Sequence, residues 1–119
     1  MNRADKSLMH RLLEEQVIQA LREIRDPELP VNIYDLGLIY DLDLDASTGA
    51  VVIRMTLTAP ACPVARSFPA TVECALREVP GIQEARVELV WDPPWSRERM
   101  SETARLTLDM YQGLLTGPG

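Results

Sequence analysis

Apolar residues near the start of the chain recur at the spacing of an amphipathic helix. They fall three or four residues apart and oppose a polar face rich in Glu and Arg. The pattern predicts a helix over residues 7–25, which ends there because Pro27 disfavours the helical conformation of the residue before it. The apolar face comprises Leu13, Val17, Ala20, Leu21 and Ile24.

From Leu38 the pattern changes to the alternation of a half-buried strand. Every second residue from Leu38 to Leu44 is apolar or aromatic, and a second alternation runs from Val51 to Leu57. The stretch DASTGA between them is typical of a turn, so the two strands form a hairpin. A third strand is expected in EARVELVW, with Val87, Leu89 and Trp91 on one side.

Two more helices are predicted after the hairpin. Helical spacing returns at Val64 and ends at Pro80-Gly81, and a last helix is expected over about residues 96–112. In this interpretation Pro63 occupies the first position of the middle helix, where its missing N–H costs nothing, and Cys62 is the N-cap.

These elements predict an α+β fold, a single two-layer domain in the order α-β-β-α-β-α. A small mixed three-stranded sheet carries its helices on one face, because the hairpin is antiparallel and the returning helix sets the third strand parallel to the second. The chain of 119 residues suits one domain over 1–119. We expect its core at about 12–112 and frayed ends at 1–6 and 113–119.

The predicted topology brings three junctions to one edge of the sheet. They are residues 26–37 before the first strand, 56–62 after the second and 91–95 after the third, at an edge where α/β proteins tend to assemble sites. Cys62 lies at this convergence. The amino end of a helix favours an anion and lowers the pKa of a thiol, although nearby carboxylates would oppose ionisation. A thiolate binds metals and attacks electrophiles.

Charge and composition exclude several classes of protein. The net charge of -6 and the absence of clustered Lys and Arg argue against nucleic-acid and anionic-membrane partners. No window approaches the ~18 apolar residues of a membrane span, and no signal-peptide core is evident, so a cytoplasmic protein with reduced thiols is expected. Cys74 would lie ~18 Å from Cys62 along the helix, too far for a disulfide, and is interpreted as a packing residue.

Structural interpretations remain open for each candidate. Cys62 could be a small apolar filler, and DPELP and YDLGL could be turn chemistry alone. Trp91 and Trp95 could cover the core or contact a partner. No GxGxxG, phosphate loop or GxSxG occurs, and two Cys with one distant His cannot supply the four ligands of a structural zinc.

Three motifs occur in order: DPELPVNIYDLGLIYDLDLD, VVIRMTLTAPACPV and VELVWDPPWSRERMSETARLTL. Together, over residues 12–110, they resemble the SufT-like iron-sulfur cluster assembly family. This domain is also found in eukaryotic cytosolic cluster-targeting proteins and in one small component of the phenylacetyl-CoA oxygenase system. That oxygenase component has an added cysteine-bearing tail, whereas this chain ends in TGPG, which favours the general assembly role.

The resemblance implies a non-enzymatic role in maturing iron-sulfur proteins, with a labile iron-sulfur cluster as cargo. It implies an iron-sulfur scaffold and client apoproteins as partners, and a homodimer is compatible with it. The family's DPE, DLG, LTxxxCP and PPW followed by MS correspond to Asp26, Pro27, Glu28, Asp35, Leu36, Gly37, Leu57, Thr58, Cys62, Pro63, Pro93, Pro94, Trp95, Met100 and Ser101. Cys62 would be the cluster ligand, supported by Asp26, Glu28, Asp35, Gly37, Thr58 and Pro63, with Trp91, Pro93, Pro94 and Trp95 contacting the partner.

One thiolate cannot hold a cluster that takes four protein ligands. Our hypothesis is therefore that Cys62 is a transient ligand, and that a second copy, a small thiol, the client or oxygen ligands at this edge supply the rest. A metal-free adaptor that docks through the DPPW rim and the acidic loop, in iron-sulfur maturation or an oxygenase-type complex, is a second hypothesis. A thiol enzyme acting through Cys62 is a third, although no general base is identifiable.

Overall fold

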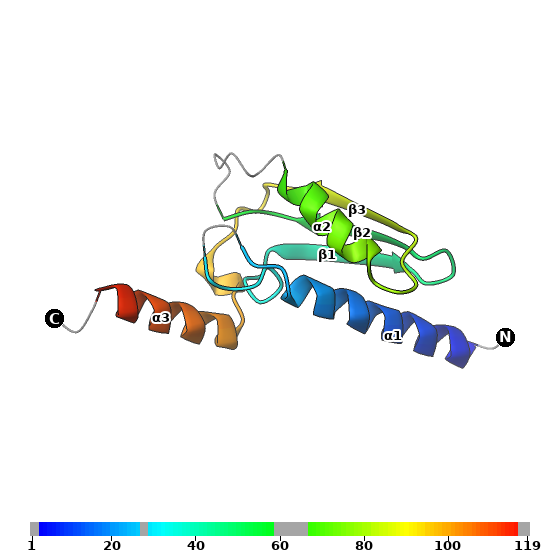
Figure 1. Ribbon diagram of the computed structural model, residues 1–119, viewed down its shortest axis with the longest axis horizontal. Helices are drawn as coiled ribbons and strands as arrows, with labels where there is room; N and C mark the ends of the chain where they lie inside the picture. The colour runs from blue at the N-terminus through cyan, green and yellow to red at the C-terminus, as the bar shows by residue number, and fades with distance from the viewer. Residues whose placement is uncertain (1–2, 27–28, 59–66, 117–119) are drawn as a thin grey trace.

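The computed structural model describes residues 3–26, 29–58 and 67–116 of the chain. Its elements follow the predicted order α-β-β-α-β-α, with one added 3-10 turn, and confirm an α+β fold (Figure 1). The elements are α1 (Arg3–Arg22), β1 (Ile39–Asp45), β2 (Ala50–Met55), α2 (Phe68–Arg77), β3 (Glu84–Leu89), the 3-10 turn η2 (Arg97–Arg99) and α3 (Glu102–Thr116).

The sheet has the strand order β1-β2-β3. β1 and β2 are antiparallel and β2 and β3 are parallel, which confirms the predicted hairpin and crossover. The pairing of β1 with β2 shifts between Ile39 and Asp41, so Tyr40 lies at a β-bulge, a feature that bends a strand and redirects side chains. In the hairpin turn, Ser47 donates two hydrogen bonds to the Asp45 carboxylate, and these lower the pKa of that carboxyl.

Most of the core lies between the sheet and two helices, and Met100, Ala104 and Leu108 extend it to the start of α3. α2 packs against β3, and α1 packs against α2 and β1 (Figure 1). Val17 and Leu21 of α1 are completely buried, as the helical pattern predicted. The stripe of α2 that faces the sheet consists of Phe68, Val72 and Leu76, and β2 contributes Val51, Ile53 and Met55.

α1 ends at Arg22, three residues before the predicted end at Arg25. The N–H groups of Glu23 and Ile24 bond to carbonyls three residues back and close the helix. Arg25 is already extended and pairs with Asn32, because a chain that approaches Pro27 must leave the helical region early. α1 begins at Arg3 and α3 ends at Thr116, so both helices extend into the ends that were expected to fray.

The predicted start of the middle helix at Val64 was wrong. α2 begins at Phe68 and its N-cap is Ser67, so Cys62 is not the N-cap of this helix. The reason is a second proline, Pro69, which lies in the first turn of α2. A helix that began at Pro63 would place Pro69 in its interior, where the ring removes a hydrogen bond and clashes with the preceding turn.

The single last helix predicted over residues 96–112 was also wrong. The turn η2 ends at Arg99, the backbone of Met100 is extended, and α3 then starts at Glu102. The Ser101 hydroxyl accepts a bond from the N–H of Ala104 at 3.1 Å, which starts a new helix. α3 runs away from the sheet, so α1 and α2, but not α3, cover its face (Figure 1). None of the helices in the described ranges could span a membrane.

Candidate functional site

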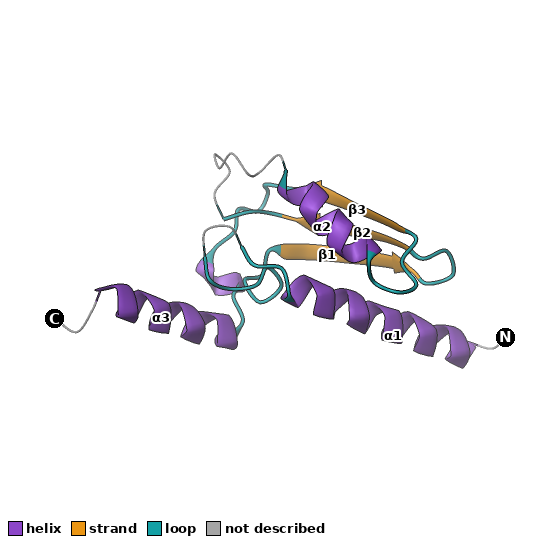
Figure 2. Cartoon of the chain, in the orientation of Figure 1, coloured by secondary structure: helices purple, strands orange, loops and turns teal. Residues whose placement is uncertain are grey.

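The described parts of the three predicted junctions meet at one end of the sheet. Figure 2 shows the loops gathered there, between the strands and α3. The bond from the Trp95 indole N–H to the Leu36 carbonyl at 2.7 Å joins two of them directly. Two more hydrogen bonds hold the strand ends beside them, from the Thr56 N–H to the Leu38 carbonyl at 2.9 Å and from the Val90 N–H to the Met55 carbonyl at 2.8 Å. The predicted convergence is therefore confirmed for the described residues.

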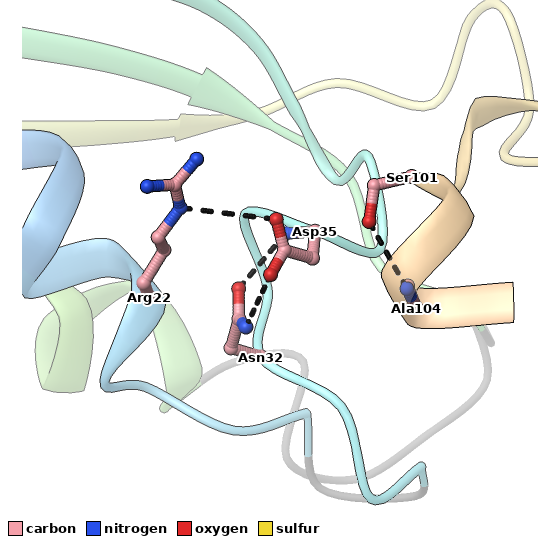
Figure 3. A network of polar contacts seen from close by, with 5 residues as sticks. All are labelled: Arg22, Asn32, Asp35, Ser101 and Ala104. Atoms are coloured by element: carbon pink, nitrogen blue, oxygen red, sulfur yellow. Dashed lines mark hydrogen bonds and ion pairs between the residues drawn. The ribbon is translucent and has the colours of Figure 1, made fainter. Parts of the chain in front are cut away.

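The DLG loop is held by its own side chains. The Asn32 amide donates to the Asp35 carboxylate at 2.8 Å, and the Asp35 N–H donates back to Asn32 at 2.8 Å (Figure 3). Arg22, at the end of α1, lies 3.8 Å from the same carboxylate and stacks over the Tyr34 ring at 5.0 Å. The Asp35 carboxylate thus ties the loop to α1.

Asp26 has a similar local role at the other end of this loop. Its side chain is 6% exposed, and its carboxylate accepts the N–H of Leu29 at 2.8 Å. The Asp26 N–H donates to the Val31 carbonyl at 3.0 Å and closes the turn. The turn-chemistry interpretation of DPELP and YDLGL therefore describes what these carboxylates do in the fold.

Residues 91–101, which we call the strap, cross this end of the sheet from β3 to the DLG loop. The Tyr40 hydroxyl donates to the Pro93 carbonyl at 2.7 Å, and the guanidinium of Arg99 lies 4.2 Å from the centre of the Tyr40 ring. The Ser101 N–H donates to the Asp35 carbonyl at 2.8 Å (Figure 3 shows both residues). Tyr40 and Arg99 were not among the predicted site residues.

Gly37 is where the strap approaches the DLG loop most closely. Its φ of +80° lies in the left-handed region, which favours glycine. A Cβ at this position would lie 2.2 Å from the Arg99 carbonyl oxygen, which is backbone and cannot move aside easily. Glycine is therefore required here for two separate reasons.

The two tryptophans differ in their surroundings. Trp95 is half-buried against the core, and its indole N–H is bonded to Leu36, so this residue fastens the strap. Trp91 is 42% exposed, and the neighbouring Pro93 and Pro94 are also exposed. Of the predicted partner contacts, these three have surface available to a partner, and their role remains a prediction.

Thr56 is a buried polar residue that the sequence did not single out. It is completely buried directly after β2, and its hydroxyl has no hydrogen-bond partner among the described residues. Such a group costs about 1–3 kcal/mol when left unsatisfied. Thr58, a predicted supporting residue, is half-buried two residues further along the same junction.

Three predicted site residues, Cys62, Glu28 and Pro63, lie outside the described residues. No group of three or more His, Cys, Asp or Glu side chains that could hold a metal occurs within residues 3–26, 29–58 and 67–116. Cys74 is exposed, which corrects its interpretation as a packing residue. It lies two residues after the buried Val72 and therefore points away from the stripe that faces the sheet.

Comparisons with known proteins agree with this arrangement of motifs. Residues 14–89 match the family model described as iron-sulfur cluster assembly protein. The chain is 44% identical to the Fe-S protein maturation auxiliary factor of Porphyromonas gingivalis, over 80% of this chain and 90% of that protein. It is 42% identical to the Fe-S protein maturation auxiliary factor YitW of Bacillus subtilis, over 84% of this chain and 97% of that protein.

A solved structure has the same fold. The domain of unknown function DUF59 from Bacillus anthracis superimposes with a TM-score of 0.78 at 38% identity, over 87% of this chain and 98% of that chain. The fold and the motifs together define a small α+β domain of the iron-sulfur cluster assembly class. The chain belongs to the iron-sulfur cluster assembly protein family, as the resemblance of its motifs indicated.

The contact of Gly37 with the strap predicts the effect of a methyl group. Gly37→Ala should destabilise the protein by more than about 2 kcal/mol, because left-handed strain alone costs about 1–2 kcal/mol and the Cβ also meets the Arg99 backbone. The control is Gly81→Ala, whose φ is +99° and whose Cβ would meet a Leu13 side chain at 3.1 Å. Urea unfolding measures both; equal losses would show that the close approach contributes nothing.

The buried hydroxyl of Thr56 predicts a stabilising substitution. Thr56→Val keeps the branched shape and removes the unsatisfied group, and should raise the free energy of unfolding by about 1 kcal/mol. Thr56→Ser keeps the hydroxyl, loses the methyl group and should be destabilised. Midpoints of urea unfolding compare the three proteins. A valine variant less stable than the wild type would indicate that the hydroxyl is bonded in solution.

Proposed function

We propose that this protein carries labile iron-sulfur clusters and delivers them to client apoproteins, with Cys62 as a transient ligand. Family membership supports iron-sulfur maturation, and two relatives are named as Fe-S protein maturation auxiliary factors. The proposal has no enzymatic step and places the protein in the cytoplasm, where thiols are kept reduced. Its partners are an iron-sulfur scaffold and the clients.

The observation that carries this proposal is the meeting of the junctions at one end of the sheet. The segment that contains Cys62 follows Thr58, after β2, and precedes Ser67, before α2. Both flanking residues therefore belong to junctions at the carboxyl end of β2. This is where the DLG loop and the strap are fastened together. The described residues on either side of the Cys62 segment thus belong to a fixed arrangement of loops, which supports the proposal that this segment presents a ligand to other proteins.

An incomplete ligand set is consistent with transfer. Clusters are usually held by four protein ligands, and this chain supplies two cysteines in all, of which Cys74 is exposed on α2. The Asp26 and Asp35 carboxylates already accept bonds that hold their loop. We therefore assign the remaining ligands to the client or to a small thiol, so that the cluster leaves when the client offers a complete set.

A second candidate function is a metal-free adaptor, and the exposure of Trp91 favours it. Trp91, Pro93 and Pro94 form an exposed rim on the strap, and the bond from Tyr40 to the Pro93 carbonyl holds that rim in place. Large aromatic residues on rigid supports frequently dominate protein interfaces. In this scheme the rim, and not Cys62, connects the scaffold to its clients.

The cluster proposal predicts the loss of delivery in a cysteine variant. After anaerobic reconstitution, Cys62→Ala should deliver cluster to an apoprotein more than about tenfold less well, since even groups that only support a metal ligand are worth about 10- to 100-fold in affinity. Cluster absorption and activation of the apoprotein are the measurements. Cys74→Ala is the matched control and should behave as the wild type. Equal delivery by Cys62→Ala would remove the thiol from the mechanism.

The adaptor candidate predicts a different variant. Trp91→Ala should weaken binding of a client by about 2 kcal/mol, roughly thirtyfold in the dissociation constant, without loss of stability, because the side chain is exposed. Trp95→Phe is the control, since it removes the bond to Leu36 and should instead lower the unfolding temperature. Calorimetric titration with the client and thermal unfolding separate the two effects. Client binding that depends on Cys62 and not on Trp91 would count against the adaptor.

A further inference from the structure

The outer edge of β3 offers unpaired main-chain groups. β3 is at the end of the sheet order, and no helix or strand in the described ranges lies beyond it (Figure 1). The N–H groups of Glu84 and Val90 point to the β2 side, where they donate to the carbonyls of Gly49, directly before β2, and of Met55, at the end of β2, respectively. In a parallel strand alternate residues face opposite ways, so the main-chain groups of Ala85, Val87 and Leu89 face outward.

Glu73 of α2 covers the middle of this edge. Its carboxylate accepts the outward N–H of Val87 at 2.8 Å, and Arg77, one turn later, lies 3.9 Å from the same carboxylate. The outward N–H groups of Ala85 and Leu89, on either side, have no partner among the described residues. Unpaired groups of this kind are a template for another strand.

The opposite edge of the sheet is unsuited to such pairing. β1 carries the bulge at Tyr40, and its exposed face bears Asp41, Asp43 and Asp45. An antiparallel partner of the same sequence would place carboxylates opposite carboxylates, and like charges in directly opposed positions are destabilising. Bulges and charges are the usual protection of an edge strand.

We propose that the edge of β3 pairs with β3 of a second copy, antiparallel, about a two-fold axis at Val87. This register is the one in which the outward groups of Ala85 meet those of Leu89 of the second copy, and those of Val87 meet their counterparts. Arg86 then lies directly opposite Glu88 of the second copy, twice per dimer. Arg86 is 70% and Glu88 38% exposed by side chain. In the single chain Glu88 lies 3.7 Å from Arg86 and 3.6 Å from Arg54, so in the dimer the exposed Arg86 exchanges the Glu88 of its own chain for that of the second copy. The strand is complementary to itself in hydrogen bonding and in charge.

Glu73 limits this association. In the single chain it occupies the N–H of Val87, which in the dimer would donate to the second copy instead. α2 lies on the same face in both copies, so two Glu73 carboxylates would also approach each other at the axis. Pairing therefore requires Glu73 to release Val87, and the wild-type dimer is correspondingly weak.

The geometry of this dimer separates the two candidate sites. β3 ends at the end of the sheet where the candidate site lies. Antiparallel pairing of two β3 strands therefore places the two candidate sites at opposite ends of a joined six-stranded sheet. A second copy bound in this way supplies no ligand to the site of the first. The proposal therefore does not depend on the proposed cluster transfer, and either can fail without the other.

The first test removes the group that covers the edge. Glu73→Ala should associate about tenfold more tightly than the wild type in sedimentation equilibrium, because the Val87 N–H becomes available and the repulsion at the axis is lost. Glu73→Gln is the matched control: it keeps an acceptor for Val87 without the charge and should lie between the two. A Glu73→Ala protein that remains monomeric at all concentrations would overturn the proposal.

The second test fixes the register. In the Glu73→Ala background, Arg86→Glu should weaken the dimer about tenfold, and the combination with Glu88→Arg should restore it, because the opposed charges are exchanged. Amide hydrogen exchange of the wild type supplies a readout without substitutions, since Ala85 and Leu89 should become protected as the concentration rises. If the protein associates while these amides stay unprotected, or if Arg86→Glu leaves the dissociation constant of the dimer unchanged, the interface lies elsewhere and the proposal is refuted.

Discussion

The attachment of the strap to the DLG loop is the contact on which the rest of the candidate site depends. The Trp95 indole bonds to the Leu36 carbonyl, and one residue later Gly37 approaches Arg99 so closely that no side chain fits. This contact fixes the end of β3 relative to the start of β1, with the end of β2 between them. Three chain segments thereby acquire a common frame that none could provide alone.

Within this frame the acidic motifs serve architecture. Asp26 closes the DPELP turn, and Asp35 links its loop to Asn32 and Arg22. Carboxylates used in this way keep a loop in one conformation at little cost, because each accepts bonds from groups that are close in sequence. Motifs that look like ligand sets in a sequence can therefore serve chiefly to hold the conformation of their own loop, as Asp26 and Asp35 do here.

Local patterns of apolar and polar residues predicted the sheet, whereas the ends of the helices depend on prolines and on contacts that these patterns do not contain. The alternation around Leu38 and Val51 sufficed for the hairpin, and connectivity alone gave the parallel β3. Pro63 suggested a helix start, but Pro69 determined it, and this could have been foreseen because a proline fits the first turn of a helix and not its interior. The break at Met100 could not, since the Ser101 N–H bonds to Asp35, far away in sequence. Likewise, no periodicity marks Tyr40 and Arg99 as neighbours.

The wide sequence separation across the strap has a consequence for the order of folding. The bond from Tyr40 to Pro93 joins residues 53 positions apart, and that from Trp95 to Leu36 spans 59. Contacts that close such long loops are favourable only once intervening structure has shortened the distance, so we expect them to form after the hairpin and α2. A nascent or partly folded chain would then have its hairpin and α2 before the strap is attached, and the three junctions would acquire their final arrangement only at the end of folding.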